Sequence, residues 1–142
     1  FDLETEYNET FNTEHISPED IEKVVVSFIG EQLQTPPIFS AKKIDGKRAY
    51  ESARVGKEIE MKKQSITIHG FSVDTTRFPE VDFTICCSKG TYIRSIAHDF
   101  GRALNSGATL IALRRIKSGD LDITQAKSVE EWMEIIDNIE II

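Results

Sequence analysis

Two segments rich in β-branched residues, followed closely by one amphipathic segment, constrain the fold of this chain most. Residues 65–75 and 81–87 are separated by a turn that contains Pro79, and this pattern predicts two antiparallel strands. In residues 92–104 the apolar positions recur at helical spacing and Gly107 ends the run, which predicts a helix. A strand pair that leads directly into a helix favours the α+β class.

Two further segments carry the signals of a helix with a defined start. Ser17 precedes a proline and two acidic residues, and apolar residues follow at helical spacing until Gly30, which is predicted to end the helix. Residues 128–139 begin with the Ser-x-x-Glu capping box of Ser128 and Glu131 and continue with an apolar face. Both segments are therefore predicted to be amphipathic helices.

The remaining segments are predicted to be shorter or extended. Pro36 and Pro37 exclude regular structure, and an extended connector is expected as far as Gly46. Residues 47–55 are a candidate short helix, and residues 109–117 are predicted to form a strand. Because the sequence shows no repeats or linkers, we expect one domain, or a large piece of one, with a mixed, mostly antiparallel sheet and flanking helices.

Composition excludes several classes of protein and site. There is no run of about 18 apolar residues and no leader-like N-terminus, so neither membrane insertion nor secretion is predicted and a cytoplasmic setting is expected. Cys86 and Cys87 are adjacent, which disfavours a disulfide between them, and they are interpreted as strand residues. The three histidines are scattered without metal-ligand spacing, and no glycine-rich nucleotide motif occurs, so neither a metal nor a nucleotide cofactor is expected.

Charge is distributed in blocks along the chain, although the net charge is −7. Residues 32–63 contain eight basic and four acidic residues, and residues 89–117 contain six basic residues and one acidic residue. The two ends of the chain are acidic. Two internal basic blocks are typical of a localised site for a polyanion, but ordinary solvated surfaces give the same pattern, so charge alone leaves both interpretations open.

The turn at Lys89-Gly90-Thr91 is the strongest candidate for a site. It ends a predicted strand and begins a predicted helix, with Thr91 as the expected N-cap and Arg94 at the third helical position. A cation there opposes the helix dipole by about 0.3–1 kcal/mol, whereas such a turn favours anions. A carboxylate or a nucleic-acid phosphate beside Arg94 would satisfy both the Arg94 guanidinium and the free amides of the turn. On the same turn, Lys89 adds a second positive charge and Tyr92 adds a stacking surface. The alternative is a surface arginine whose stem packs on the core.

A second pair of arginines lies in the predicted strand at residues 109–117. Side chains alternate between the two faces of a strand, so Arg114 and Arg115 are expected to point in opposite directions. At most one of them can point inward with the neighbours of Leu113. The other is then available to bind phosphate.

Several of these segments also form longer patterns. Residues 34–43 read Gln-x-Pro-Pro-x-aromatic-Ser-Ala-x-Lys, and residues 87–94 read Cys-Ser-x-Gly-Thr-Tyr-Ile-Arg. Asp99 and Gly101 form Asp-x-Gly, and residues 107–115 read Gly-Ala-x-x-x-x-Leu-Arg-Arg. Taken together, these patterns resemble the tRNA pseudouridine synthase B family over nearly the whole chain.

The resemblance implies a function and roles for individual residues. The function is isomerisation of a uridine in the T arm of tRNA to pseudouridine, without metal or organic cofactor, after the nucleotide is flipped from its stack. By position, Tyr92 would stack on the flipped base, Arg94 would pair with the catalytic aspartate, and Leu113 would help to line the pocket. The RNA-facing surface would include Lys43, Arg54, Lys89 and Arg115.

The sequence departs from the family pattern at the catalytic aspartate. In the family this residue lies in an upstream Asp-Pro loop, followed by a second active-site tyrosine, but no Asp-Pro pair occurs here. The resemblance therefore implies the C-terminal portion of a catalytic domain, inactive by itself and without a separate C-terminal RNA-binding domain. Apolar surface that the missing half would cover favours self-association of such a truncated chain. A non-catalytic RNA-binding module is the main alternative, and a structural or protein-interaction domain is the third.

Overall fold

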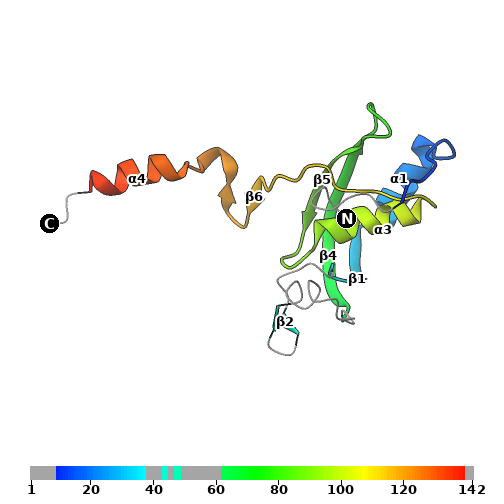
Figure 1. Ribbon diagram of the computed structural model, residues 1–142, viewed down its shortest axis with the longest axis horizontal. Coiled ribbons are helices and arrows are strands. Elements are labelled where there is room, and N and C mark those ends of the chain that lie inside the picture. The colour runs from blue at the N-terminus through cyan, green and yellow to red at the C-terminus, as the bar shows by residue number, and fades with distance from the viewer. Residues whose placement is uncertain (1–8, 38–42, 45–46, 49–61, 140–142) are drawn as a thin grey trace. The chain divides into compact units, whose positions relative to one another are not determined.

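The computed structural model describes residues 9–37, 43–44, 47–48 and 62–139, and its fold is α+β, as predicted (Figure 1). The chain divides into two compact units, Phe1–Ile111 and Ala112–Ile142. Across the described residues, every helix is too short or too polar to cross a membrane.

The first unit is built on a three-stranded antiparallel sheet with the strand order β1-β4-β5. The strands are β1 (Gly30–Gln34), β4 (Gln64–Asp74) and β5 (Asp82–Cys87) (Figure 1). The predicted strand pair is therefore confirmed, and Cys86 and Cys87 are strand residues with free thiols. Strand β1 was not predicted from the sequence. It pairs with β4 along its full length, from Gly30 opposite Ile68 to Gln34 opposite Gln64.

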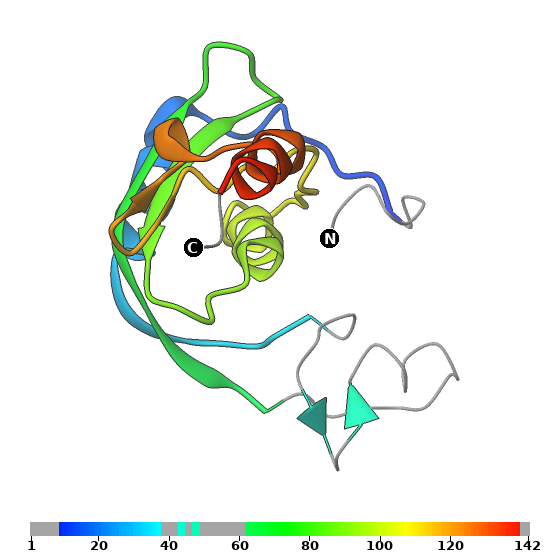
Figure 2. The ribbon, with the colours of Figure 1, turned by 90° about the vertical axis from the view of Figure 1, so that its left-hand side faces the viewer.

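Two predicted helices of this unit are also confirmed. Helix α1 (Pro18–Ser27) begins at Ser17, which forms a capping box with Asp20, and helix α3 (Ile93–Ala103) lies along one face of the sheet (Figures 1 and 2). The prediction that Gly30 ends the first helix is wrong, because α1 ends before Gly30. The φ angle of +109° at Gly30 instead lets the chain turn into β1.

The hydrophobic core joins both helices to the sheet. Three phenylalanine rings, from the end of α1, from β4 and from α3, pack edge to face or tilted with centroids 5.7–6.1 Å apart. These rings are Phe28, Phe71 and Phe100. Ile68, in the middle of the central strand, has no exposed surface. The helix that carries the candidate site is therefore fixed to the sheet by apolar contacts.

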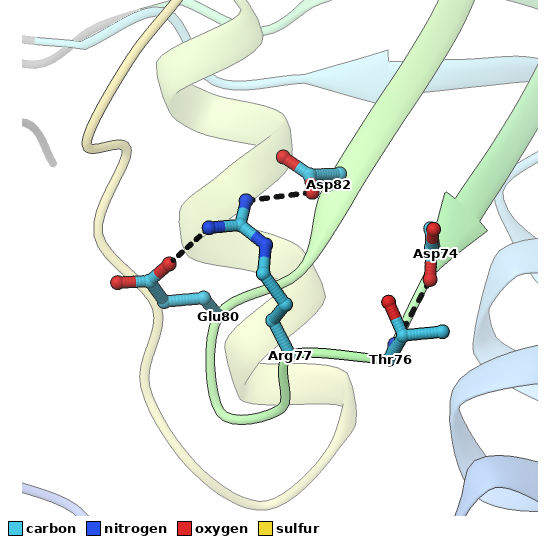
Figure 3. Close-up of polar contacts among 5 residues, drawn as sticks. All are labelled: Asp74, Thr76, Arg77, Glu80 and Asp82. Atoms are coloured by element: carbon cyan, nitrogen blue, oxygen red, sulfur yellow. Dashed lines mark hydrogen bonds and ion pairs between the residues drawn. The ribbon is translucent and has the colours of Figure 1, made fainter.

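The turn between β4 and β5 is closed by polar contacts (Figure 3). Arg77 contacts Glu80 at 3.0 Å and Asp82 at 2.7 Å, and the amide of Thr76 donates to the carboxylate of Asp74 at 2.9 Å. The hydrogen bonds from Thr76 lower the pKa of Asp74. This turn contains the cis Phe78–Pro79 peptide bond.

Two very short strands follow β1 in the sequence. They are β2 (Lys43–Ile44) and β3 (Lys47–Arg48), which pair with each other in antiparallel fashion. Strand β2 agrees with the predicted extended connector. The candidate helix at residues 47–55 is wrong for its first two residues, because Lys47 and Arg48 are held in strand pairing. The rest of that helix lies outside the described residues.

The second unit contains a small hairpin and a helix. The hairpin pairs β6 (Lys117–Ser118) with β7 (Leu121–Asp122), and a 3-10 turn, η1 (Ile123–Gln125), follows. Helix α4 (Val129–Asp137) confirms the predicted helix, including the capping box of Ser128 and Glu131.

The strand predicted at residues 109–117 is wrong for most of its length. Leu110 forms one isolated bridge and Lys117 belongs to β6, but residues 111–116 have no strand structure. A strand exists through its pairing, and within the described residues this stretch meets no partner strand. The alternation argument for Arg114 and Arg115 therefore does not apply.

Candidate active-site turn at the start of helix α3

The turn between β5 and α3 is fastened to the central strand of the sheet. The amide of Ser88 donates to the carbonyl of Thr67 at 2.8 Å, and the amide of Thr67 donates to the Ser88 hydroxyl at 2.9 Å. The side chain of Gln64 donates to the carbonyl of Gly90 at 2.6 Å. Gly90 has a φ angle of +83°, a conformation that suits glycine and lets the chain reverse here. The turn therefore starts from a defined position on β4.

The predicted N-cap of the helix is wrong by one residue. Tyr92 occupies the N-cap position, and in the described part of the chain no side chain caps α3. The Thr91 hydroxyl donates instead to the carbonyl of Ser88 at 2.8 Å, which turns it away from the helix amides. Arg94 is consequently the second helical residue rather than the third.

Arg94 is half-buried in the first turn of α3, a turn that the structure describes in full and that contains no acidic residue of its own. A cation at the second helical position opposes the helix dipole as it would at the third, since the dipole acts throughout the first turn. The helix N-terminus and the guanidinium together favour an anion at this end of α3.

The end of β1 holds the same turn from the other side. The amide of Tyr92 donates to Oε1 of Gln34 at 2.8 Å, and Nε2 of Gln34 donates to the carbonyl of Tyr92 at 3.0 Å. One residue after Gln34 and three residues after Tyr92, a further bond forms: the Ser95 hydroxyl donates to the carbonyl of Thr35 at 2.8 Å. Gln34 and Ser95 are 2% and 3% exposed, so these bonds form away from solvent. Two motifs that are distant in the sequence therefore meet at the candidate site.

The structure brings only part of the predicted site together. Lys89, Tyr92 and Arg94 lie on one turn, with Lys89 exposed and the other two half-buried. Lys43 lies in β2, and Arg54 lies outside the described residues. The last two predicted residues, Leu113 and Arg115, precede β6 and belong to the second unit. They are therefore described separately from the turn.

Sequence reasoning missed the roles of Gln34 and Ser95. Gln34 was recognised as the first residue of a motif, but its contact with Tyr92 is 58 residues away in the sequence. The available signal was an amide side chain two residues before a proline pair that favours extended backbone. That signal indicates where the chain is extended, but it does not indicate which segment the amide meets.

Titratable groups near the turn show one resolved perturbation. Burial lowers the pKa of His98, one helical turn after Arg94, and the positive charge of Arg102 acts in the same direction, while Asp99 opposes it. Across the part of the chain that the structure describes, no group of three or more His, Cys, Asp or Glu side chains could hold a metal ion.

Comparison with known proteins places these features in a family. The family described as TruB family pseudouridylate synthase (N terminal domain) matches residues 1–93. A tRNA pseudouridine synthase B from Flavobacterium johnsoniae is 54% identical over 134 residues, which cover 94% of this chain and 58% of that protein. The tRNA pseudouridine synthase B of Phocaeicola vulgatus is 46% identical over 141 residues, covering 99% of this chain and 60% of the relative.

A solved structure shares the fold. It is the crystal structure of a Cbf5-Nop10-Gar1 complex, in which one chain matches with a TM-score of 0.63 and 24% identity over 88% of this chain and 35% of that one. The chain spans about three fifths of the length of the two bacterial relatives. The resemblance inferred from the sequence motifs is confirmed: the chain belongs to the TruB family of pseudouridylate synthases.

Proposed function

We propose that the protein containing this chain is a cytoplasmic tRNA pseudouridine synthase, which isomerises a uridine in the T arm of tRNA to pseudouridine without metal or organic cofactor. The observation that carries the proposal is the turn at residues 88–95. It carries Tyr92 and Arg94 two residues apart, both half-buried, and it is fastened to both β1 and β4. The names of the two bacterial relatives support the same reaction.

In this proposal Tyr92 forms one wall for the flipped base. An enzyme that acts on a base of a folded RNA must extrude that nucleotide and hold it against an aromatic or apolar surface. Tyr92 is half-buried, and its main chain is bonded at both the amide and the carbonyl. A ring on such a fixed backbone can hold the base in one orientation, as near-attack geometry requires.

Arg94 is proposed to pair with the catalytic aspartate. The sequence contains no Asp-Pro pair, which is where the family carries that residue, and the first turn of α3 supplies no acid. Arginine suits this role because its planar fork binds a carboxylate through two parallel hydrogen bonds. We place this chain in the C-terminal portion of the catalytic domain and expect it to be inactive by itself.

The RNA-facing surface is proposed to include Lys89 on this turn and the other basic residues that the family resemblance assigns to it. Lys89 lies on the same turn, three residues before Tyr92, and its exposed side chain is proposed to bind a phosphate beside the flipped nucleotide. Lys43, in β2, is proposed to contribute to the same surface. Arg54, Arg115 and the pocket-lining Leu113 complete the assignment that the family resemblance implies.

The proposal is tested with an unmodified tRNA transcript that carries tritium at C5 of its uridines. Isomerisation releases this hydrogen to water, so tritium release measures pseudouridine formation directly. The full-length protein is expected to release one equivalent per tRNA, and the 142-residue chain none. A full-length protein that binds tRNA in a salt-dependent manner but releases no tritium would support the RNA-binding module instead. Tritium release by the isolated chain would contradict its expected inactivity.

A further inference from the structure

The side chain of Gln34 bonds both main-chain groups of Tyr92 at once. It accepts from the amide nitrogen at 2.8 Å and donates to the carbonyl oxygen at 3.0 Å. We propose that Gln34 is a positioning residue, which fixes the backbone of Tyr92 and thereby the Tyr92 ring and the Arg94 guanidinium. The two hydrogen bonds between Gln34 and the main chain of Tyr92 are called the Gln34 clamp below. The consequence for catalysis rests on the proposed function, whereas the clamp itself rests on these two contacts.

Of the side chains in their usual ionisation state near pH 7, a carboxamide of this length fits both partners best. It carries a donor and an acceptor in one plane, whereas an ionised carboxylate only accepts and an ammonium only donates. The other amide residue, asparagine, is one methylene shorter. Gln34 is 2% exposed, so water cannot readily replace either bond. Replacing Gln34 therefore leaves the amide of Tyr92 without its partner, while the Tyr92 carbonyl keeps only the helical bond from the amide of Ile96 at 3.2 Å.

A second hydrogen bond, three residues further along α3, holds the helix to the same segment. The hydroxyl of Ser95 donates to the carbonyl of Thr35 at 2.8 Å, so the end of β1 holds α3 at two points that lie on either side of Arg94. The next residue along, Pro36, is fully buried and restricts the chain at the base of the clamp. Residues 92–95 are therefore set by the position of β1.

Strand β1 is itself a rigid support. All five of its residues pair with β4, the central strand, and Gln34 lies opposite Gln64. Gln64 in turn donates to the carbonyl of Gly90 at 2.6 Å, on the same turn that Gln34 holds. Two glutamines from neighbouring strands thus bond three main-chain groups of one turn, which is more restraint than a surface loop normally has.

If the clamp positions Tyr92 and Arg94, its loss should slow the chemical step rather than weaken the binding of tRNA. Gln34 is buried and has no surface to offer to RNA, so its loss should leave tRNA affinity nearly unchanged. The alignment of the Tyr92 ring and Arg94 should loosen, which slows the chemical step. A residue with a general structural role would instead lower the thermal stability and the fraction of active protein, without changing the rate of the molecules that remain folded.

The test uses three variants of the full-length protein. Gln34→Met keeps an unbranched side chain of similar length and removes both bonds, and Gln34→Glu removes only the donor while its carboxyl is ionised. Gln32→Met is the matched control, because Gln32 lies on the same strand and its amide donates at 2.6 Å to the carbonyl of Phe28 instead. Single-turnover tritium release, tRNA affinity and amide hydrogen exchange at Tyr92 are measured for each.

For Gln34→Met we expect the Tyr92 amide to exchange at least about tenfold faster, while the amide of Ile68 in the core keeps its protection. The single-turnover rate should fall by about 10- to 100-fold, with tRNA affinity within about threefold of the wild type. The control should match the wild type in all three measurements.

For Gln34→Glu the rate relative to the wild type should rise as the pH is lowered from about 8 to about 6. A protonated carboxyl both donates and accepts and so replaces the amide, and burial favours this neutral form. A structural role would not produce this rescue in the rate of the folded molecules.

The outcomes separate the clamp from the proposed function. Unchanged exchange at Tyr92 in Gln34→Met overturns the clamp. Faster exchange with an unchanged rate overturns the positioning role while the proposed function stands. A wild-type protein that releases no tritium overturns the proposed function, and the exchange measurement still decides whether Gln34 holds Tyr92.

Discussion

Nε2 of His15 lies 3.0 Å from the carbonyl oxygen of Leu104, the residue that follows helix α3. Carbonyls at the end of a helix lack partners within the helix, and a side-chain donor satisfies one of them. The contact joins the segment before α1 to the far end of the helix that begins at the candidate site. It therefore fixes α3 at the end opposite the Gln34 clamp.

Replacing His15 should weaken this attachment. We expect His15→Ala to lower the free energy of unfolding by about 0.5 kcal/mol, because one exposed hydrogen bond is lost. The urea unfolding midpoint measures the change. The control is His69→Ala, at an exposed position of β4, which should leave the midpoint nearly unchanged. Equal shifts in both variants would contradict a specific role for the contact with Leu104.

Ser95→Ala should reduce both stability and activity. The variant removes a buried hydroxyl and leaves the carbonyl of Thr35 without this donor, at a cost of about 1–2 kcal/mol. Tritium release should slow in the same variant, because the second attachment of α3 to β1 is lost. Ser72→Ala, at an exposed position of β4, serves as the control. A Ser95→Ala protein with wild-type rate would show that the Gln34 contact alone is sufficient.

His98 should make the stability of the fold depend on pH. Burial holds the pKa of His98 below its ordinary value of 6.5, so the unfolded chain binds this proton more readily than the folded one. The stability that neutral His98 contributes to the fold is present in full above pH 6.5 and is lost as the pH falls through the pKa of the folded state. His98→Gln should therefore reduce the decline of the urea midpoint between about pH 7.5 and about pH 5.5. An undiminished decline in this variant would assign it to other groups.

Arg94→Lys keeps the charge at the start of α3 but loses the planar fork. If Arg94 pairs with the catalytic aspartate, tritium release by the full-length protein should fall by about 100-fold while tRNA affinity changes little. Arg102→Lys, in the last turn of the same helix, is the control and should have little effect on either quantity. Equal losses of rate and affinity in Arg94→Lys would indicate that Arg94 mainly holds a phosphate.

Gly101 allows a close approach between α3 and the segment that follows it. A Cβ at Gly101 would overlap the backbone of Gly107 and Ala108, and backbone cannot swing aside. We expect Gly101→Ala to lower the free energy of unfolding by about 1–3 kcal/mol. A Cβ at Gly107 would instead overlap the half-exposed ring of Phe11, which can move aside because it is a side chain. Gly107→Ala should therefore lower the free energy of unfolding by less than Gly101→Ala does. Thermal melts of both variants test this order.

Local signals were sufficient for the long elements of the fold. Capping residues and helical spacing identified α1, α3 and α4, and β-branched composition identified β4 and β5. Strand β1 escaped prediction because Gly-Glu-Gln-Leu-Gln has little β propensity and becomes a strand through its pairing with β4. The strand predicted at residues 109–117 failed for the converse reason, since favourable composition was not matched by a partner.

The candidate site was predictable to the same extent. The order of strand, turn and helix placed Tyr92 and Arg94 together, because they are neighbours in the sequence. The error of one residue at the N-cap arose because the Thr91 hydroxyl bonds back to Ser88, a local competition that spacing does not reveal. The contact of Gln34 with Tyr92 depends on how two distant segments pack, and no periodicity within either segment encodes it.

The two ends of the β4–β5 hairpin lie in different surroundings. Its register runs from Ile68 opposite Cys87, next to the candidate site, to Asp74 opposite Asp82, where the contacts of Arg77 close the tip (Figure 3). The tip is thus separated from the site by the length of the strand pair and is exposed to solvent. An affinity handle or a fluorescent label inserted there should therefore leave the turn at residues 88–95 undisturbed.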